Sequence, residues 1–298
     1  MVRQYKIHTN LDGTDDKVWD VTNGKVRFYQ PSNLGLQSTN NIWQSDGVGV
    51  MGTRSIIQPQ IEFKLETFGE SLEENYRLMK DFVNDILSKK FVTLEYQTEI
   101  FQVYADLALA EVTKTEGYGK NGTFSEKITF DIITKWYTYE NLTFDMIKNG
   151  KVIAGKSKIY GGTAPGNYKY VKGTSYTYYG ESNIDRLSRW DIKDEIFSFM
   201  GILYPQLPKT PAGVRFLDDI GNEYTAIVFK TEQVQNYILI NTDVNDEIYQ
   251  GWNGTTSLNL FPVMDFERYR TRIIKHGQME LINLSKAEFK IKRKADFV

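Results

Sequence analysis

Ser71 to Lys90, SLEENYRLMKDFVNDILSKK, stands almost alone as a well-marked amphipathic helix in a chain that otherwise reads as short strands and polar turns. Ser71 can accept a hydrogen bond from the Glu74 amide while the Glu74 carboxylate accepts one from the Ser71 amide, which satisfies two donors at a helix start. Six apolar residues then recur at three- and four-residue spacing and are predicted to share one face: Leu72, Tyr76, Met79, Val83, Ile86 and Leu87. The stretch therefore predicts a helix that covers something apolar.

Strands are predicted on both sides of this helix, because apolar and polar residues alternate there with a period of two. In the first half these runs are Ile57 to Glu66, Phe91 to Tyr96, Phe101 to Leu109 and Phe124 to Ile133. The second half adds the tyrosine-rich segments around Tyr168–Tyr170 and Tyr176–Tyr178, then Glu223 to Lys230 and Tyr237 to Asn241. The chain is predicted to be mainly β, with a β-sandwich or barrel flanked by one helix and then a second antiparallel sandwich.

Two domains are expected, since 298 residues exceed the usual single domain of roughly 100 to 150 residues. The alternating run that ends at Ile133 gives way to polar turns after Trp136–Tyr139. We therefore predict a first domain over residues 1–138, which contains the helix at 71–90, and a second over residues 139–298.

One segment, from Arg186 to about Gly213, does not fit the strand pattern. It holds three of the seven prolines, and proline lacks a ladder donor, so the segment is not expected to be a central strand. Its run Phe197 to Tyr204 is nevertheless too apolar for a solvated loop. We expect an extension that packs on a partner, with three candidate anchors, or one that caps its own sandwich; the candidates are Phe199, Leu203 and Tyr204.

Composition excludes several classes of function. A net charge of −2 removes the electrostatic case for nucleic-acid recognition. The longest apolar stretch, Phe197 to Tyr204, is too short to cross a bilayer of about 30 Å. No apolar run follows the basic start of the chain, so no secretory signal is expected and the protein is predicted to be made in a cytosol and to stay soluble. With zero cysteines, the chain offers no disulfide, thiolate metal site or cysteine nucleophile.

No enzyme site is predicted. The two histidines, His8 and His276, lie in different expected domains, without a nucleophile or carboxylate at a recognised catalytic spacing. The carboxylate pairs Asp15–Asp16, Glu73–Glu74 and Asp218–Asp219 fit turns or a helix cap better than a glycosidase site.

No cofactor is expected, although the sequence leaves the binding of a structural Ca²⁺ ion as an alternative. Asp12–Asp16 and Asp243–Glu247 offer oxygen ligands of the kind that Ca²⁺ accepts. Neither run follows the order of a twelve-residue EF-hand loop, so solvated loops are the favoured reading.

Exposed aromatic residues leave an alternative function, a carbohydrate-binding β-sandwich module. Trp43, Trp190 and Trp252 lie in loop-rich β segments where an indole could stack on a sugar. Core packing or protein contact is the favoured reading of these residues, and a wall-degrading glycosidase is a more distant third.

The order of the expected elements and the residue pattern along the whole chain resemble those of the distal tail proteins of siphophages, in particular the members found in the baseplates of phages that infect lactococci. The resemblance rests on five stretches and covers essentially the full length. They are KVWDVTNGKVRFYQ (Lys17–Gln30), GTRSIIQPQIEFKLE (Gly52–Glu66), FSEKITFDIITKWY (Phe124–Tyr137), SYTYYGESNID (Ser175–Asp185) and the ending FPVMDFERYRTRIIKHGQMELINLSKAEFKIKRKADFV (Phe261–Val298). In the family ending, a proline-containing strand leads through a turn glycine, here Gly277, into two closing strands.

The resemblance implies an N-terminal β domain related to tail-tube proteins, which assembles into a homo-hexameric ring, and a C-terminal galectin-like β-sandwich. It also implies a structural hub at the tail tip or baseplate of the virion, assembled in the host cytoplasm. Such a hub joins the tail tube protein to the tail-tip protein and carries receptor-binding proteins, which lactococcal members grip with an extension of the sandwich. Arg186 to about Gly213 is our candidate for that extension.

Overall fold

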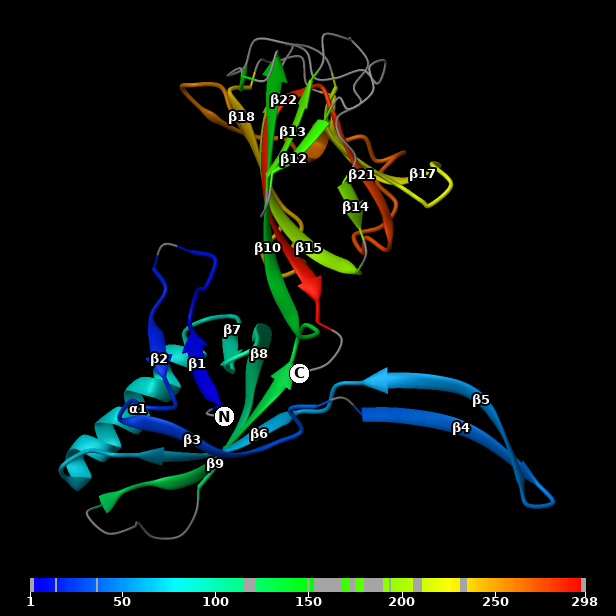
Figure 1. Ribbon diagram of the computed structural model, residues 1–298. Coiled ribbons are helices and arrows are strands. Elements are labelled where there is room, and N and C mark those ends of the chain that lie inside the picture. Colours follow the sequence, from blue (N-terminus) through cyan, green and yellow to red (C-terminus); the bar gives the residue numbers. More distant parts are fainter. Residues whose placement is uncertain are drawn as a thin grey trace. The chain divides into compact units, whose positions relative to one another are not determined.

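The computed structural model describes residues 3–13, 15–35, 37–114, 122–148, 151–152, 168–171, 175–179, 190–192, 194–205, 211–230 and 235–295. The chain divides into two compact units, Met1–Thr138 with Ala295–Val298, and Tyr139–Lys294. Both are built mainly from strands, and α1 (Leu72–Leu87) belongs to the first unit (Figure 1). The prediction of a mainly β fold with one flanking helix is confirmed.

Seven antiparallel strands of the first unit form a continuous curved sheet in the order β2-β1-β7-β8-β9-β6-β3. They are β1 (Gln4–His8), β2 (Val18–Asp20), β3 (Val26–Ser32), β6 (Ile61–Thr67), β7 (Val92–Gln97), β8 (Gln102–Thr113) and β9 (Ser125–Ile132). Alternation sets which side faces the core: in β6, Ile61, Phe63 and Leu65 are buried and the residues between them face outward. The Phe28 amide of β3 also donates to the Val21 carbonyl just after β2, so the two ends of the sheet meet.

The helix α1 begins as predicted, with the Ser71 side chain accepting from the Glu74 amide at 3.2 Å. The second half of the predicted capping pair is different: the Glu74 carboxylate accepts from the amide of Glu70 at 2.7 Å, one residue further back. Glu74 also pairs with Lys25 Nζ at 2.6 Å. The cap thus ties the helix start to the segment between β2 and β3.

The predicted apolar face of α1 is only partly right. Met79, Val83 and Ile86 pack against the core of the first unit as expected, but Leu72, Tyr76 and Leu87 are exposed. The buried stripe is centred on Phe82, whose ring contacts Trp19 at 5.2 Å and Phe28 at 5.8 Å between centroids. The largest apolar side chain sets the rotation of the helix and turns the predicted stripe partly toward solvent.

An additional hairpin lies between β3 and β6 in the sequence. It consists of β4 (Gln37–Ser45) and β5 (Val48–Ile57), which form a two-stranded sheet of their own (Figure 1). This pair of strands was not predicted from the sequence.

The second unit is a β-sandwich. One sheet has the order β22-β15-β18-β19-β20 and the other β14-β21-β16-β17. β10 (Tyr137–Lys148), which starts at the end of the first unit, continues into the second and pairs with β13 and β11, and β12 pairs with β13. The remaining bounds are β11 (Lys151–Val152), β12 (Tyr168–Val171), β13 (Ser175–Tyr179), β14 (Trp190–Ile192), β15 (Ile196–Pro205), β16 (Ala212–Leu217), β17 (Glu223–Phe229), β18 (Tyr237–Asn241), β19 (Ile248–Trp252), β20 (Ser257–Asn259), β21 (Gly277–Ile282) and β22 (Leu284–Lys294).

The core of the sandwich takes side chains from both sheets. Phe199 of β15 contacts Phe216 of β16 and Phe289 of β22, each at a centroid distance of 5.9 Å. The family-like ending is partly as expected: Gly277 starts β21, and β22 follows as a second closing strand. The expected proline-containing strand is instead a single 3₁₀ turn, η2 (Phe261–Val263).

The described part of the segment from Arg186 to about Gly213 belongs to the sandwich, and for these residues the prediction of an extension is corrected. β15 is a central strand that pairs with β22 on one side and β18 on the other. Proline does not prevent this, because Pro205 stands at the last position of the strand, beyond a register irregularity. β16 then supplies a strand to the opposite sheet. Residues 186–189, 193 and 206–210 lie outside the described residues.

Candidate assembly interface

The hairpin β4–β5 exposes an unusual amount of apolar surface. Every side chain described between Gln37 and Ile57 is exposed, and Trp43 retains 68% of its accessible surface. The hairpin closes through Asp46 (φ 51°) and Gly47 (φ 80°), a two-residue turn with both φ values positive. Such a turn matches the twist of the strands and fixes their register. A large exposed apolar patch on a defined hairpin is typical of a protein interaction site.

Both faces of the hairpin tip are apolar. Trp43 lies opposite Val50 on one face, while Ile42 lies opposite Met51 on the other, because successive side chains alternate. The side chains keep 49% to 68% of their surface, so neither face is covered by the rest of the chain. Since an isolated two-stranded hairpin is marginally stable in water, the tip is expected to gain stability from a partner.

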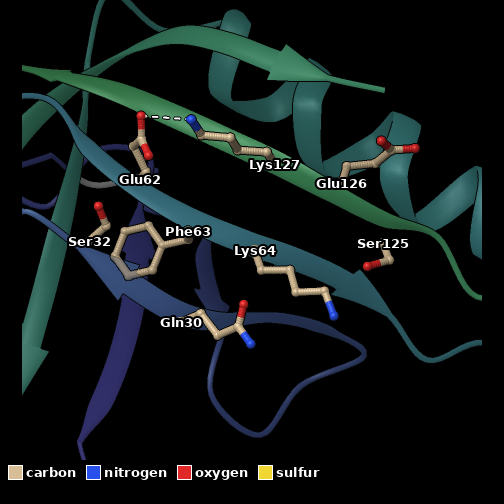
Figure 2. A pocket seen from close by; sticks show the side chains of 8 residues that line it. All are labelled: Gln30, Ser32, Glu62, Phe63, Lys64, Ser125, Glu126 and Lys127. Atoms are coloured by element: carbon tan, nitrogen blue, oxygen red, sulfur yellow. Dashed lines mark ion pairs between the residues drawn. The ribbon is translucent and has the colours of Figure 1, made fainter. Parts of the chain in front are cut away.

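A groove opens over the outer face of β6, between residues of β3 and β9 (Figure 2). Its volume is about 300 Å³, and its lining residues are Gln30, Ser32, Glu62, Phe63, Lys64, Ser125, Glu126 and Lys127. An irregularity in the β3–β6 register between Tyr29 and Ser32, with Gln30 at φ 47°, shapes one wall. On another wall Lys127 Nζ pairs with the Glu62 carboxylate at 2.8 Å. The groove therefore combines paired charges with neutral hydrogen-bonding side chains.

The three predicted partner-binding residues have different environments. Phe199 and Leu203 keep 3% and 0% of their surface and belong to the core of their own sandwich. A side chain buried this way has no surface left for a partner, so these two are corrected to core residues. Tyr204 is half-buried, and Lys286 Nζ lies 5.4 Å from the centroid of its ring. Tyr204 alone keeps surface that a partner could contact.

The first histidine, His8, lies in a cluster of charged residues that was not predicted from the sequence. His8 Nδ1 is 2.6 Å from Asp16 Oδ2, and His8 Nε2 is 2.8 Å from Glu95 Oε2. Lys6 Nζ also donates to Glu95, at 2.9 Å. Burial raises the pKa of Glu95, but the bonds from Lys6 and His8 outweigh it, and the net effect holds this pKa below its ordinary value. With both ring nitrogens engaged and His8 buried, the cluster is suited to holding β1, β7 and the following loop together.

The other carboxylates that the sequence singled out are also engaged. Asp15 pairs with Lys89, and Asp243 forms a buried pair with Lys292 at 2.9 Å. Asp218 accepts two amide hydrogen bonds within its turn, and Asp219 pairs with His276 at 2.8 Å. Within the part of the chain that the structure describes, no group of three or more His, Cys, Asp or Glu residues is arranged to hold a metal ion.

Comparison with known proteins agrees with this domain structure. Residues 4–133 match the family model of the distal tail protein N-terminal domain, and residues 135–298 match that of the Dit C-terminal domain. The chain belongs to the distal tail protein family. Among relatives, the distal tail proteins of Lactococcus phage p2 and Lactococcus phage SK1 are 94% and 92% identical over 100% of both chains.

Solved structures of this family share the fold. Two chains that are 94% identical and fully covered on both sides superimpose with TM-scores of 0.79 and 0.80; they come from the phage p2 baseplate in its activated conformation, with Ca and with Sr. Dit of phage SPP1, described as a paradigm of the hub adsorption apparatus, is 11% identical and has a TM-score of 0.55, covering 99% of this chain and 100% of its own. As a distal tail protein, this chain is a structural component of the phage tail tip. Among its described helices, none is long and apolar enough to span a membrane.

The hairpin was missed, although the sequence contained its signal. Asp46-Gly47 between residues of high β propensity is the strongest short-range indication of a two-residue hairpin turn. The groove had no such signal, because it depends on the register of strands that lie about thirty and sixty residues apart in the sequence.

Proposed function

We propose that this chain is the structural hub of a phage baseplate, in which copies associate into a closed homo-hexameric ring through the first unit. The ring joins the tail tube protein to the tail-tip protein, and the galectin-like second unit carries receptor-binding proteins. The number of copies and the partners follow from the family resemblance. The presence of 94% identical chains in phage p2 baseplates supports the assembly context.

The observation that carries the ring proposal is the two-faced apolar tip of the hairpin β4–β5. An exposed two-stranded sheet with free edges and apolar faces promotes association, and a closed ring satisfies such contacts without open-ended aggregation. The hairpin lies in the first unit, which is where the resemblance assigns ring formation. A hub of this kind needs no catalytic residues, and we propose that the chain has none.

We also propose a structural role for Ca²⁺ in the assembled baseplate. Baseplates of a 94% identical relative have been solved with Ca and with Sr. The acidic runs identified in the sequence hold carboxylates that already pair with Lys89 and Lys292 or hydrogen-bond to the His8 ring. A cation that acts on this chain would have to displace these partners or use other ligands.

Mass measurement of the full chain in solution tests the ring. A particle of six copies is expected, and a closed ring should not grow further as concentration rises. A chain that stays monomeric or dimeric at high concentration, and that binds glycans until Trp252 is replaced, would instead support the carbohydrate-binding alternative.

A further inference from the structure

The outer face of the sheet β22-β15-β18-β19-β20 carries a row of aromatic side chains. Successive side chains of a strand point to opposite faces, so the outward positions follow from the buried ones. Leu203 of β15 and Ile238 of β18 lie opposite each other and are fully buried. The next residues, Tyr204 and Tyr237, therefore point away from the core, and Tyr237 lies opposite Trp252 of β19. Three adjacent strands thus place three aromatic residues side by side.

Polar groups flank this aromatic row. Lys286 of β22 lies opposite Tyr204, and Ser257 of β20 lies opposite Trp252. Gln250 of β19 is exposed two residues before Trp252, on the same face. Among the described residues, the indole N–H of Trp252, the amide of Gln250 and the hydroxyl of Ser257 have no hydrogen-bond partner in the protein. The row therefore offers both ring surface and unused hydrogen-bonding groups.

The rings of the row do not cover one another. Within the part of the chain that the structure describes, no ring contact joins Tyr204, Tyr237 and Trp252. Tyr237 is 37% exposed, and the other two are half-buried. The outward face of an antiparallel sheet is commonly solvated and polar, so an aromatic row there is unusual. Its rings remain available to a ligand.

We propose that the aromatic row of Tyr204, Tyr237 and Trp252 binds an extended, uncharged carbohydrate chain of β-linked pyranose units, laid across the strands. This binding goes beyond the proposed hub function and does not depend on the ring.

The chemistry of the row fits a sugar chain. The C–H bonds on one side of a pyranose ring carry partial positive charge, and the face of an aromatic ring carries negative charge, so the two attract. Sugar hydroxyls both donate and accept, and they can exchange hydrogen bonds with Gln250, Ser257 and the Trp252 indole. Lys286 is paired with Glu288, so the surface has no unpaired charge to bury and suits a neutral ligand.

The dimensions and shape of the row favour β-linked chains. Adjacent strands lie about 4.8 Å apart, so the three rings span about 10 Å, a length comparable with a disaccharide. Ile202 and Leu239 are half-buried in the neighbouring outward positions and widen the apolar strip. An open sheet face requires a flat ligand. A β-linked glucan or chitin-type chain is an extended ribbon, whereas an α-linked glucan curls away from such a surface.

Isothermal titration calorimetry of the full chain with soluble oligosaccharides tests the site. Chitohexaose and cellohexaose are the β-linked probes, and maltohexaose is the matched α-linked control. We expect at least one β-linked probe to bind, and maltohexaose to bind several-fold more weakly. Trp252→Ala and Tyr237→Ala should each weaken binding about tenfold, and Trp252→Phe, which keeps a ring, should weaken it less. Phe266→Ala, at an aromatic residue of the same unit that is 50% exposed and outside the row, should leave binding unchanged.

Urea unfolding of each variant shows that it is folded, and Tyr237→Ala serves alone if Trp252→Ala does not fold. The proposal is overturned if wild type binds neither β-linked probe at millimolar concentration, or if both aromatic variants bind as wild type does. It is also overturned if wild type binds no sugar and Trp252→Ala loses another tail protein, since the row is then a protein contact. Particle mass keeps the two proposals apart: hexamers that bind no sugar refute only this site, and monomers that bind it refute only the ring.

Discussion

The strand β15 and the hairpin β4–β5 are both rich in large apolar residues, yet one is buried and the other is exposed. β15 pairs on both sides and places Phe199 and Leu203 in the sandwich core. The hairpin pairs only with itself and leaves Trp43 and Val50 with about two-thirds of their surface. Apolar content alone therefore does not distinguish a core strand from a contact surface in this chain.

What separates the two segments is the number of neighbours that the topology supplies. β15 lies between β22 and β18 and faces a second sheet, so the apolar side chains on its inner face, Phe199 and Leu203 among them, are covered. The hairpin is an insertion between two strands of a sheet that is complete without it. Surface that one chain cannot cover is left for another chain, which is why the hairpin is the better candidate for assembly.

The largest expected effect tests the core assignment of β15. Phe199→Ala or Leu203→Ala should lower the free energy of unfolding of the second unit by about 3 to 5 kcal/mol, because each leaves a cavity in a packed core. Urea unfolding of the full chain measures it. The control Ile220→Ala, at a side chain that is 83% exposed in the same unit, should change stability by no more than about 0.5 kcal/mol. Unchanged stability with loss of receptor-binding protein would restore the original interpretation of Phe199 and Leu203 as anchors.

The next effect tests the hairpin. Trp43→Ser or Val50→Ser should weaken self-association by about 2 kcal/mol or more, roughly a 30-fold change in dissociation constant, with little change in the unfolding of the monomer. Light scattering over a dilution series measures it. Val244→Ser is a matched control for Val50→Ser, since the two valines are 67% and 65% exposed. If Val244→Ser weakens association as much as Val50→Ser does, the hairpin is not the specific contact.

Much of the fold could be predicted from the sequence, because local patterns determine it. The capping of α1 by Ser71 and the bounds of β18 follow from spacing and alternation alone. The rotation of α1 could not be predicted, because Phe82 finds Trp19 and Phe28 only in the folded unit. The predicted partner-binding site at Phe199 and Leu203 was wrong for a similar reason. The burial of Phe199 depends on β22, a strand that lies about ninety residues further along the chain.

A smaller effect concerns Tyr204, the one predicted anchor with free surface. Tyr204→Ala should cost the second unit about 1 kcal/mol, since it removes a half-exposed ring and its contact with Lys286. If Tyr204 contacts the receptor-binding protein, Tyr204→Ala should also reduce co-purification of that protein, while Tyr204→Phe, which keeps the ring, should largely preserve it. Equal capture by wild type and Tyr204→Ala would remove the last of the three predicted anchors.

The smallest expected effect is a pH dependence confined to the first unit and absent from the hairpin. The pKa of Glu95 is lowered in the folded state by Lys6 and His8 against the opposing effect of burial, so the folded state binds the Glu95 proton less readily than the unfolded chain does. The stabilisation that the ionised Glu95 gives the folded state is therefore fully present above about pH 4.5 and is lost as the pH falls through the lowered pKa.

Glu95→Gln should destabilise the first unit at about pH 7, and the difference in stability from wild type should shrink toward about pH 3. Urea unfolding at the two pH values measures the change. A stability difference that stays constant between them would mean that Glu95 acts through packing alone. Trp43→Ser should show no such pH dependence, because the hairpin tip carries no comparable buried charge.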